Sequence, residues 1–382
     1  MGICASSKRV QQEEDCDENV VYVMDDCGGG GGKGEDGHGC RKVASLYSQK
    51  GKKGPNQDAV ILCQGFGMED GVFCGVFDGH GRCGQYVSKL VRDYLPFMIL
   101  SQRNALALGA AGDDDDDPAF SDASPSPSST DGSGSSGGGS SPAPAQQLLD
   151  EWREACAAAF DAMDKELKLQ SPNLDCSFSG TTAVCAIKQG SDLIIANLGD
   201  SRAVLATMSD SGHLAAVQLT VDHKPSLPGE AERIKRCGGR VFALKDEPSV
   251  ARVWLPGEDL PGLAMARSLG DLRLKRHGVV PEPEVAHRRV GRGDLFIVLA
   301  TDGVWDVMSN EEVVSIVCAT ARKEHAAKAV AEAAAQRWRT RYPASRVDDC
   351  SAVCLFLRDQ DWGSSVAAAR AKAAAGCGGG RY

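Results

Sequence analysis

The sequence lacks the features that mark membrane and secreted proteins. No run approaches the roughly eighteen apolar residues that a membrane-spanning helix needs. The start of the chain has no apolar stretch of the kind found in secretory signals. The 15 cysteines include no C-x-x-C pair, a spacing typical of zinc ligands. We therefore expect an intracellular protein without a transmembrane helix, whose thiols are reduced and mostly packed as small apolar side chains.

An excess of positive charge is also missing. The formal net charge is -10 at pH 7, whereas nucleic-acid partners require basic surfaces that neutralise phosphates. We therefore expect no nucleic acid as a partner. Apolar residues make up 42% of the 382 residues and charged residues 25%. That balance is ordinary for a globular protein and allows a sizeable core.

Composition divides the chain into regions. Residues 1–40 contain a glycine run and scattered charges, so we expect an unfolded leader that buries little apolar surface. Residues 104–145, which include the aspartate run 113–117, predict a solvated insert rich in Ser, Pro and Gly. Recognisable patterns resume on both sides of the insert. We therefore expect one domain over 41–360, followed by an Ala/Gly-rich tail at 361–382.

Short β runs alternate with helical patterns in the rest of the sequence. The runs at Gly180–Lys188 and Leu193–Leu198 are separated by four residues, a link too short for a parallel crossover, so we expect an antiparallel hairpin. Apolar residues at helical spacing predict helices at Gln85–Leu100 and Gln146–Leu169. A further helix, Pro228–Arg236, begins with proline and ends before glycine.

A capping box starts another predicted helix, since Ser309 and Glu312 have the required spacing. Antiparallel strands with separate helices indicate the α+β class. We expect two packed antiparallel β-sheets flanked by helices on both sides, an α-β-β-α sandwich.

Aspartates recur where the predicted strands begin or end. The motifs GPNQD, GVFDGHG, NLGDSR, LATDGVWD and RVDDCSAVC contain Asp58, Asp78, Asp200, Asp302, Asp306, Asp348 and Asp349. A single Asp-Gly pair indicates only a tight turn. Taken together, the carboxylates can converge on one rim of a sheet sandwich, where they would repel one another unless a cation is bound. Oxygen ligands without His or Cys favour Mg²⁺ or Mn²⁺, and two such ions can aim an activated water at phosphorus.

The order of eight motifs, NQD, DGHG, GTTA, LGDSR, DHKP, LAMARSLGD, TDGVWDVM and DDCSAV, resembles the metal-dependent type 2C serine/threonine protein phosphatase family, and plant members in particular. The resemblance covers roughly residues 43–358, apart from the insert. It implies hydrolysis of phosphoserine and phosphothreonine in proteins, in a signalling context. The implied cofactors are two Mg²⁺ or Mn²⁺ ions per site with a third, weaker site, and the implied partners are phosphoproteins and protein kinases.

The resemblance also implies ligands for the metal ions. Asp78 would bridge the two catalytic ions, and the Gly79 carbonyl would bind one of them. Asp302 and Asp348 would complete the shell of the first ion, and Asp58 would act through a bound water.

Three further positions match functional residues of the family. Asp200 and Asp306 correspond to the third, weaker metal site. His80 corresponds to the general acid that protonates the leaving seryl or threonyl oxygen, a role suited to an imidazole that titrates near neutral pH.

The sequence departs from the family pattern in the first and last motifs. Lys53 stands where an arginine often grips the substrate phosphate, and it offers a point charge without a bidentate fork. Gln57 replaces a glutamate, so it can hydrogen-bond a metal-bound water but adds no charge. Asp349 stands where asparagine is common, and we take Asp348 as the ligand. The changes at Lys53 and Gln57 support one alternative, a catalytically impaired phosphoprotein-binding scaffold of the same fold.

Other phosphatase chemistries find no support, because the chain has neither a His-Cys dipeptide nor a GNHE segment. A hormone-receptor-regulated plant branch carries a receptor-contacting tryptophan near the position of Trp254. The surrounding VWLPGEDLPG looks like a different branch, so we expect Trp254 to serve packing. We expect a monomer.

The first residues, MGICASSKR, match an acylation pattern. Gly2 with Ser6 fits N-myristoylation, and Cys4 is a candidate for palmitoylation. One myristoyl chain binds membranes only marginally, so stable residence needs the second lipid. We expect association with the plasma membrane if both lipids are attached, and otherwise a cytoplasmic and nuclear protein.

Overall fold

The computed structural model describes residues 22–26, 41–110, 144–171, 173–343 and 347–357. Within these ranges no helix is both long and apolar enough to cross a membrane. The strands form two large sheets and one small one, and every pairing between named strands is antiparallel.

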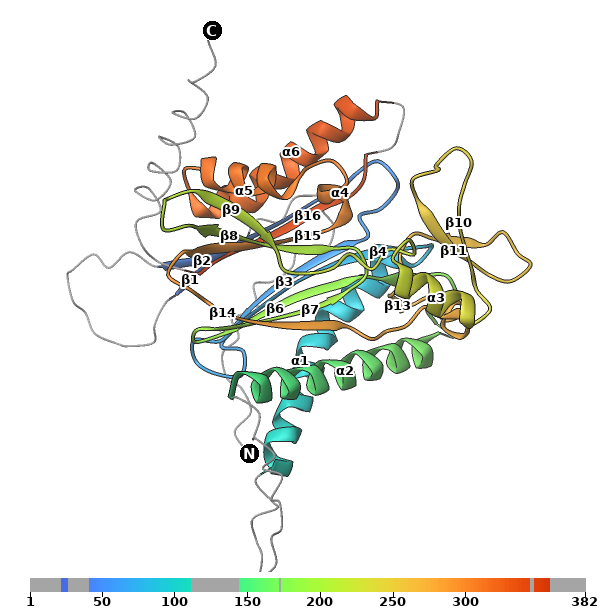
Figure 1. The fold of residues 1–382 in the computed structure, drawn as a ribbon, viewed down its shortest axis with the longest axis horizontal. Helices are drawn as coiled ribbons and strands as arrows, with labels where there is room; N and C mark the ends of the chain where they lie inside the picture. Colours follow the sequence, from blue (N-terminus) through green and yellow to red (C-terminus); the bar gives the residue numbers. More distant parts are fainter. Residues whose placement is uncertain (1–21, 27–40, 111–143, 172, 344–346, 358–382) are drawn as a thin grey trace, which may run out of the picture.

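The first sheet has six strands (Figure 1). Their spatial order is β1 (Tyr22–Asp26), β2 (Arg41–Gln49), β16 (Cys350–Phe356), β15 (Asp294–Ala300), β8 (Arg202–Met208) and β9 (Leu214–Gln218). The last described strand, β16, therefore lies inside this sheet between β2 and β15.

The second sheet has seven strands. Their order is β13 (Leu269–Gly270), β5 (Gly180–Thr181), β4 (Val72–His80), β6 (Ala183–Gln189), β7 (Asp192–Leu198) and β14 (Glu284–Arg289), with β3 (Asp58–Gln64) paired to β4. Strands β6 and β7 form the hairpin predicted from their four-residue separation, which is confirmed.

Helices cover the outer face of each sheet (Figure 1). Helices α1 (Gly84–Ala110) and α2 (Pro144–Gln170) pack on the second sheet, and α4 (Asp302–Trp305), α5 (Asn310–Ala319) and α6 (Ala326–Arg341) pack on the first. A separate apolar cluster fills the space between the sheets. The predicted α-β-β-α sandwich of the α+β class is confirmed.

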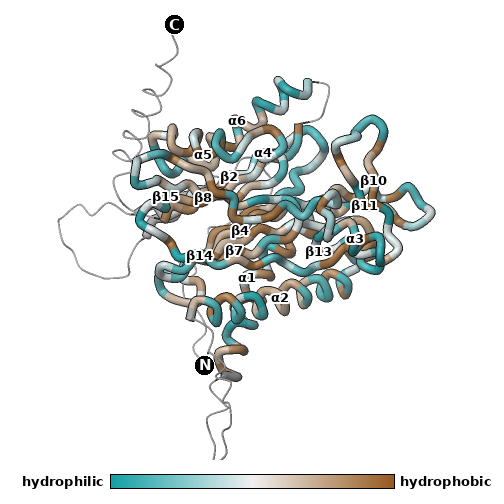
Figure 2. Tube along the Cα trace, viewed as in Figure 1, coloured by the Kyte–Doolittle hydropathy of each residue, from teal (hydrophilic) through white to brown (hydrophobic). Residues whose placement is uncertain are grey.

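Burial on both faces explains why the central strands read as continuous apolar runs. In β6, Val184 and Ala186 belong to the core between the sheets, whereas Cys185 and Ile187 belong to the core beneath the helices. Successive side chains point to opposite faces of a sheet, so a strand that is buried on both faces needs apolar residues at successive positions. Figure 2 shows the resulting hydrophobic interior of the strand layers.

A small sheet with its own helix forms a flap beside the sandwich. It contains β10 (Arg240–Ala243), β11 (Ala251–Trp254) and β12 (Pro261–Leu263), with the predicted helix α3 (Pro228–Arg236) packed against it. Trp254 is buried, stacks on Phe242 at a centroid distance of 4.9 Å and donates from Nε1 to the Phe242 carbonyl. The packing role expected for Trp254 is therefore confirmed.

Two segments are more regular than expected. Strand β1 lies within 1–40, where we predicted an unfolded leader, and it pairs with β2. Its sequence YVMDD begins with β-forming residues, a signal that the overall composition of the leader obscured. Helix α1 continues through residues 104–110 of the predicted insert. The remaining parts of the leader, insert and tail lie outside the described residues.

The capping box of Ser309 and Glu312 is confirmed at the start of α5.

Two 3-10 turns complete the element list, η1 (Lys275–His277) after β13 and η2 (Lys323–His325) before α6. The first of them matters for the site, because Lys275 contacts the segment just before β13.

Candidate active site

The aspartates predicted from the motifs meet at one rim of the sandwich. Asp58 and Asp78 are directly opposite each other in the β3–β4 pairing. Asp302 begins α4 just after β15, and Asp348 lies two residues before β16, which pairs with β15. Asp200 follows β7. Because the two sheets pack face to face, these strand ends are stacked, and side chains distant in sequence become neighbours.

Electrostatics show how closely the carboxylates gather. Burial raises the pKa of Asp78 well above its ordinary value, and the charges of Asp302, Asp58, Asp348 and Asp200 raise it further. Burial likewise raises the pKa of Asp302 to about 8, again with contributions from Asp200 and Asp348. A cluster of this kind is unfavourable without positive charge.

Asp306 belongs to the same cluster. Burial raises the pKa of its carboxyl group, Lys224 opposes that rise, and the charges of Asp200 and Asp348 add to it. The position of Asp306, one turn after Asp302, follows from the short helix α4.

Two lysines supply part of the missing charge. Lys224 Nζ lies 2.5 Å from Asp200 Oδ2, and Lys53 Nζ donates to Asp348 Oδ2. Burial alone would lower the pKa of Lys53, but the Asp348 charge and hydrogen bond hold it above its usual value. Across the described ranges, no three carboxylate, imidazole or thiol groups already converge as the ligands of one ion. Asp200 and Asp348 are bonded to these two lysines instead.

The residues nevertheless fit a hard divalent cation. Asp200 Oδ1 is buried and has no hydrogen-bond partner in the described part of the chain, so it has unused capacity for a positive partner. The converging donors are carboxylate oxygens, the ligand type that Mg²⁺ and Mn²⁺ prefer. The nearby Cys350 is no competitor, because burial raises the pKa of its thiol far above the usual range.

Glycine is required at the end of strand β4, where the predicted carbonyl ligand Gly79 lies. A Cβ on Gly79 would lie 2.5 Å from the carbonyl oxygens of both Gln57 and Gly84, closer than any side chain tolerates. Gly79 N donates to the Gln57 carbonyl at 3.2 Å. The end of β4 is thus packed closely against the segment that carries Asp58.

The structure gives Gln57 and Asp349 bracing contacts. The Gln57 amide donates to the Gly81 carbonyl at 2.7 Å, which ties it to the turn between β4 and α1. The two Asp349 oxygens accept from the backbone N–H groups of Gly51 and Gln57, at 2.6 and 2.8 Å. Both Asp349 oxygens are therefore committed, which supports Asp348 as the member of the pair that faces the cluster.

Asp58 is fixed by a hydroxyl from the opposite sheet. Thr301 Oγ1 donates to Asp58 Oδ2 at 3.0 Å, and Ser351 N donates to Thr301 Oγ1 at 3.1 Å. This chain of bonds links β3, β15 and β16 at the rim. The Asp58 carboxyl has its pKa raised by burial and by Asp349.

His80 pairs with a residue that the sequence did not single out. His80 Nε2 lies 2.7 Å from Asp271 Oδ2. Burial would lower the pKa of His80, but the Asp271 charge and hydrogen bond raise it above its ordinary value. Asp271 closes the LAMARSLGD motif, and the only hint of its role was an aspartate following glycine in a motif without an assigned function.

A second unexpected feature is a clamp between two loops. Asp222 receives a fork of hydrogen bonds from Arg202, with Nε to Oδ1 at 3.0 Å and Nη2 to Oδ2 at 2.6 Å. The next residue, His223, donates its N–H to the Gly199 carbonyl and accepts from Gly199 N at Nδ1. The segment that carries Asp200 is therefore held from both sides by the DHK segment, which fixes where Asp200 points.

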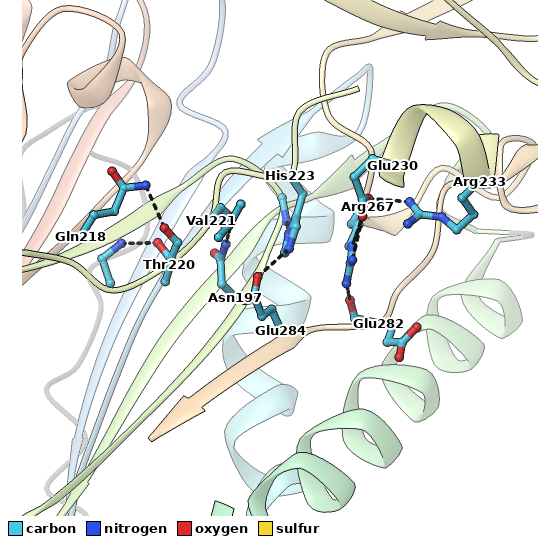
Figure 3. A network of polar contacts seen from close by, with 12 residues as sticks. Asn197, Gln218, Thr220, Val221, His223, Glu230, Arg233, Arg267, Glu282 and Glu284 are labelled. Atoms are coloured by element: carbon cyan, nitrogen blue, oxygen red, sulfur yellow. Dashed lines mark hydrogen bonds and ion pairs between the residues drawn. The ribbon is translucent and has the colours of Figure 1, made fainter. Parts of the chain in front are cut away.

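Two further groups of polar residues lie near this clamp and the flap (Figure 3). His223 Nε2 lies 3.4 Å from a carboxylate oxygen of Glu284 at the start of β14, but burial lowers the pKa of His223 to about 4, so the ring is neutral at pH 7 and forms no ion pair. In α3, Glu230 receives bonds from Arg267 at 2.7 Å and from Arg233 at 2.6 Å. Burial opposes ionisation of Glu230, but these two guanidinium groups lower its pKa to about 2. The network therefore connects the flap helix to the loop before β13.

Comparison with known proteins identifies the family to which the chain belongs. The profile of the family described as "Protein phosphatase 2C" matches residues 142–344. The chain belongs to the protein phosphatase 2C family, and this membership supports a serine/threonine protein phosphatase.

Individual relatives agree with the family match. The chain is 76% identical over 368 residues to "Probable protein phosphatase 2C 12" of Oryza sativa subsp. japonica, and the match covers 96% of this chain and 94% of the relative. It is 46% identical to "Probable protein phosphatase 2C 72" of Arabidopsis thaliana, over 84% of this chain and 87% of the relative.

The fold recurs in solved structures. A serine-threonine phosphatase 2C from Toxoplasma gondii superposes with a TM-score of 0.68 over 89% of this chain and 99% of that one, at 24% identity. This likeness supports the architecture alone.

Proposed function

We propose that the protein is a catalytically competent phosphatase that hydrolyses phosphoserine and phosphothreonine in proteins with the aid of Mg²⁺ or Mn²⁺. The observation that carries the proposal is the convergence of Asp58, Asp78, Asp302 and Asp348 from four separate segments. Carboxylates that lie together and raise one another's pKa are typical of functional sites.

Two ions would be held by residues at this rim. Asp78 and the Gly79 carbonyl would bind from β4, with Asp302 and Asp348 from the opposite sheet, and Asp58 would act through a water. Asp200 and Asp306 would serve a third, weaker site. When bound, the ions supply a water acidified enough to attack phosphorus at neutral pH. The residues themselves fix where that attack can occur.

The remaining roles fall to two side chains. Lys53, half of whose side chain is exposed, would bind the substrate phosphate once a metal ion takes over Asp348. His80 would protonate the leaving seryl or threonyl oxygen. Both lie at the same rim as the aspartates, since Lys53 donates to Asp348 and His80 ends β4 two residues after Asp78.

The cellular setting is also a proposal. Phosphoproteins in signalling would be the substrates, protein kinases are candidate partners, and the protein would act as a monomer. Acylation of Gly2 and Cys4 would hold it at the plasma membrane, and the unacylated protein would occupy cytoplasm and nucleus.

A metal titration tests the proposed activity against the scaffold alternative. The purified chain is incubated with a phosphothreonine peptide, first with a chelator and then with increasing Mn²⁺ or Mg²⁺. We expect phosphate release only with metal. A chain that binds the phosphopeptide but releases no phosphate at any metal concentration would be the impaired scaffold. The intact set of predicted ligands favours the enzyme.

A further inference from the structure

We propose that Asp271 is a positioning residue for the proposed reaction: it holds the His80 imidazole in the orientation that delivers a proton to the leaving oxygen. The inference rests on the phosphatase activity proposed above and adds a residue to it. The contact joins residues 191 positions apart in the sequence.

The contact itself is short and partly buried. His80 Nε2 and Asp271 Oδ2 are 2.7 Å apart, and the same oxygen accepts from Ser268 Oγ at 2.6 Å. Asp271 is completely buried. With Nε2 committed to Asp271, the other ring nitrogen, Nδ1, is buried and has no hydrogen-bond partner within the described ranges. The ring is therefore fixed through one nitrogen and has the other left for a further partner.

The strands are arranged to make this contact. His80 ends β4 and pairs with Gly180 of β5, which pairs on its other side with Gly270, the neighbour of Asp271. A Cβ on Gly180 would lie 2.5 Å from Asp271 Oδ2 and 2.8 Å from His80 Nε2. Only glycine at position 180 leaves room for the two side chains to meet across β5.

The Asp271 backbone is held in a rare conformation. Its φ of 49° makes it the one non-glycine residue with positive φ among the described residues. A left-handed conformation in a buried, non-glycine residue persists only where the surroundings enforce it, and such outliers gather at functional sites. Here the Asp271 N–H donates to the Ser179 carbonyl at 2.9 Å.

A second layer of contacts fixes the residues around Asp271. Lys275 Nζ donates to the Ser268 carbonyl at 2.5 Å and lies 3.0 Å from Asp164 Oδ1 in α2. That same Asp164 oxygen accepts from Gly270 N at 2.9 Å. Helix α2 therefore supports the loop that carries Asp271, and the His80 ring inherits this rigidity.

The proton balance of the step is simple. As a water oxygen forms a new bond to phosphorus, the bond to the seryl or threonyl oxygen breaks and its electron pair goes to that oxygen, which takes a proton from Nδ1 of the His80 ring. The attacking water releases a proton to solvent, and the ring regains one from solvent before the next turnover. Asp271 accepts the Nε2 hydrogen bond throughout and is not consumed.

The test compares two substrates whose leaving groups differ in basicity. A threonine alkoxide needs protonation as it leaves, whereas nitrophenolate hardly does. In the metal-loaded full chain, we expect Asp271→Asn to lower kcat on a phosphothreonine peptide by roughly tenfold or more and on p-nitrophenyl phosphate by less than about threefold. Asparagine tolerates left-handed backbone, so the variant keeps the local conformation.

A double-mutant cycle with His80→Gln separates positioning from general damage. If Asp271 acts through His80, adding Asp271→Asn to His80→Gln lowers kcat on the phosphothreonine peptide little further. Equal losses on both substrates, or effects that multiply in the double variant, would overturn the inference. If thermal unfolding shows that Asp271→Asn does not fold, Ser268→Ala replaces it as the test variant. Ser268→Ala removes one hydrogen bond to the same carboxylate. It must then lower kcat more on the phosphothreonine peptide than on p-nitrophenyl phosphate, by a smaller factor than expected for Asp271→Asn.

Wild-type behaviour keeps the two proposals distinguishable. A wild-type chain without metal-dependent activity on either substrate refutes the proposed function. An active wild type with a uniformly slowed Asp271→Asn refutes only the role of Asp271.

Discussion

Lys53 Nζ donates a hydrogen bond to Asp348 Oδ2, joining the first and last motifs of the site across 295 residues of sequence. A metal ion at Asp348 would compete for the same carboxylate and free the lysine for the substrate phosphate. We predict that Lys53→Ala raises KM for a phosphopeptide by roughly tenfold and lowers kcat less, whereas Lys53→Arg keeps or improves KM. Steady-state kinetics at saturating Mn²⁺ measure this. The matched control is Lys52→Ala, an exposed neighbour, and an unchanged KM in Lys53→Ala would place the lysine elsewhere in the mechanism.

Asp302 is the carboxylate on which the metal proposal depends most. We predict that Asp302→Asn lowers kcat by on the order of a hundredfold or more, with partial rescue by high Mn²⁺, because a neutral amide holds a hard dication less well. The metal-free variant should unfold at about the same temperature as wild type near pH 7, because the raised pKa of Asp302 already leaves its carboxyl largely protonated and uncharged without metal. Asp306→Asn, at the proposed third and weaker metal site, should lower kcat by a smaller factor. If the Asp302→Asn variant is as active as wild type over a metal titration, the two-metal site is contradicted.

The ionised Glu230 carboxylate stabilises the folded chain through its ion pairs with Arg233 and Arg267. Its pKa lies at about 2 in the folded chain, below its ordinary value of 4.5, so its stabilising effect is complete above pH 4.5 and fades as the pH falls toward 2. We predict that Glu230→Gln lowers the free energy of unfolding at pH 7 by on the order of 1 to 2 kcal/mol.

Urea unfolding at about pH 7, 5 and 4, with chelator present throughout, measures this difference. The difference in the free energy of unfolding between wild type and Glu230→Gln should become smaller as the pH falls. Glu232→Gln, on the exposed side of the same helix, serves as the control. A gap that stays constant or widens toward the lowest pH would show that the Glu230 charge does not act as described.

The segment between α1 and α2 should be dispensable. Its Asp, Ser, Gly and Pro content cannot build a core, and changing the length of a loop costs little entropy. We predict that replacing 111–143 by a short Gly-Ser linker leaves turnover of p-nitrophenyl phosphate within about twofold. The thermal unfolding temperature is measured in parallel, and loss of the fold in this variant would contradict the prediction.

Membrane association should depend on the acylation pattern at the start of the chain. We predict that Gly2→Ala releases the protein into the soluble fraction and that Cys4→Ser leaves it weakly bound, because one lipid chain gives only marginal affinity. Cell fractionation with and without each substitution measures the distribution. Wild-type protein found wholly in the soluble fraction would rule out the anchor.

The motifs predicted the aspartates at the rim of the site better than the residues that hold the site side chains in place. Asp78 and Asp302 could be found because each follows an apolar strand segment in a recognisable motif, so local sequence fixes both the strand and the carboxylate. Asp271 could not, because its importance depends on contact with His80 across β5, and no local pattern encodes that meeting. Gln57 shows the same limit: its amide could have faced a metal-bound water, but the Gly81 carbonyl lies within reach and binds it.

The place of β16 inside the first sheet affects how the protein is made. Until β16 has left the ribosome, β2 and β15 have no strand between them, and the sheet exists only as two halves with open edges. Asp348 emerges just ahead of β16, so the last of the proposed ligands arrives with the strand that closes the sheet. A nascent chain therefore lacks the complete set of proposed ligands until β16 has emerged, and a chain released before that point would expose edges that favour aggregation.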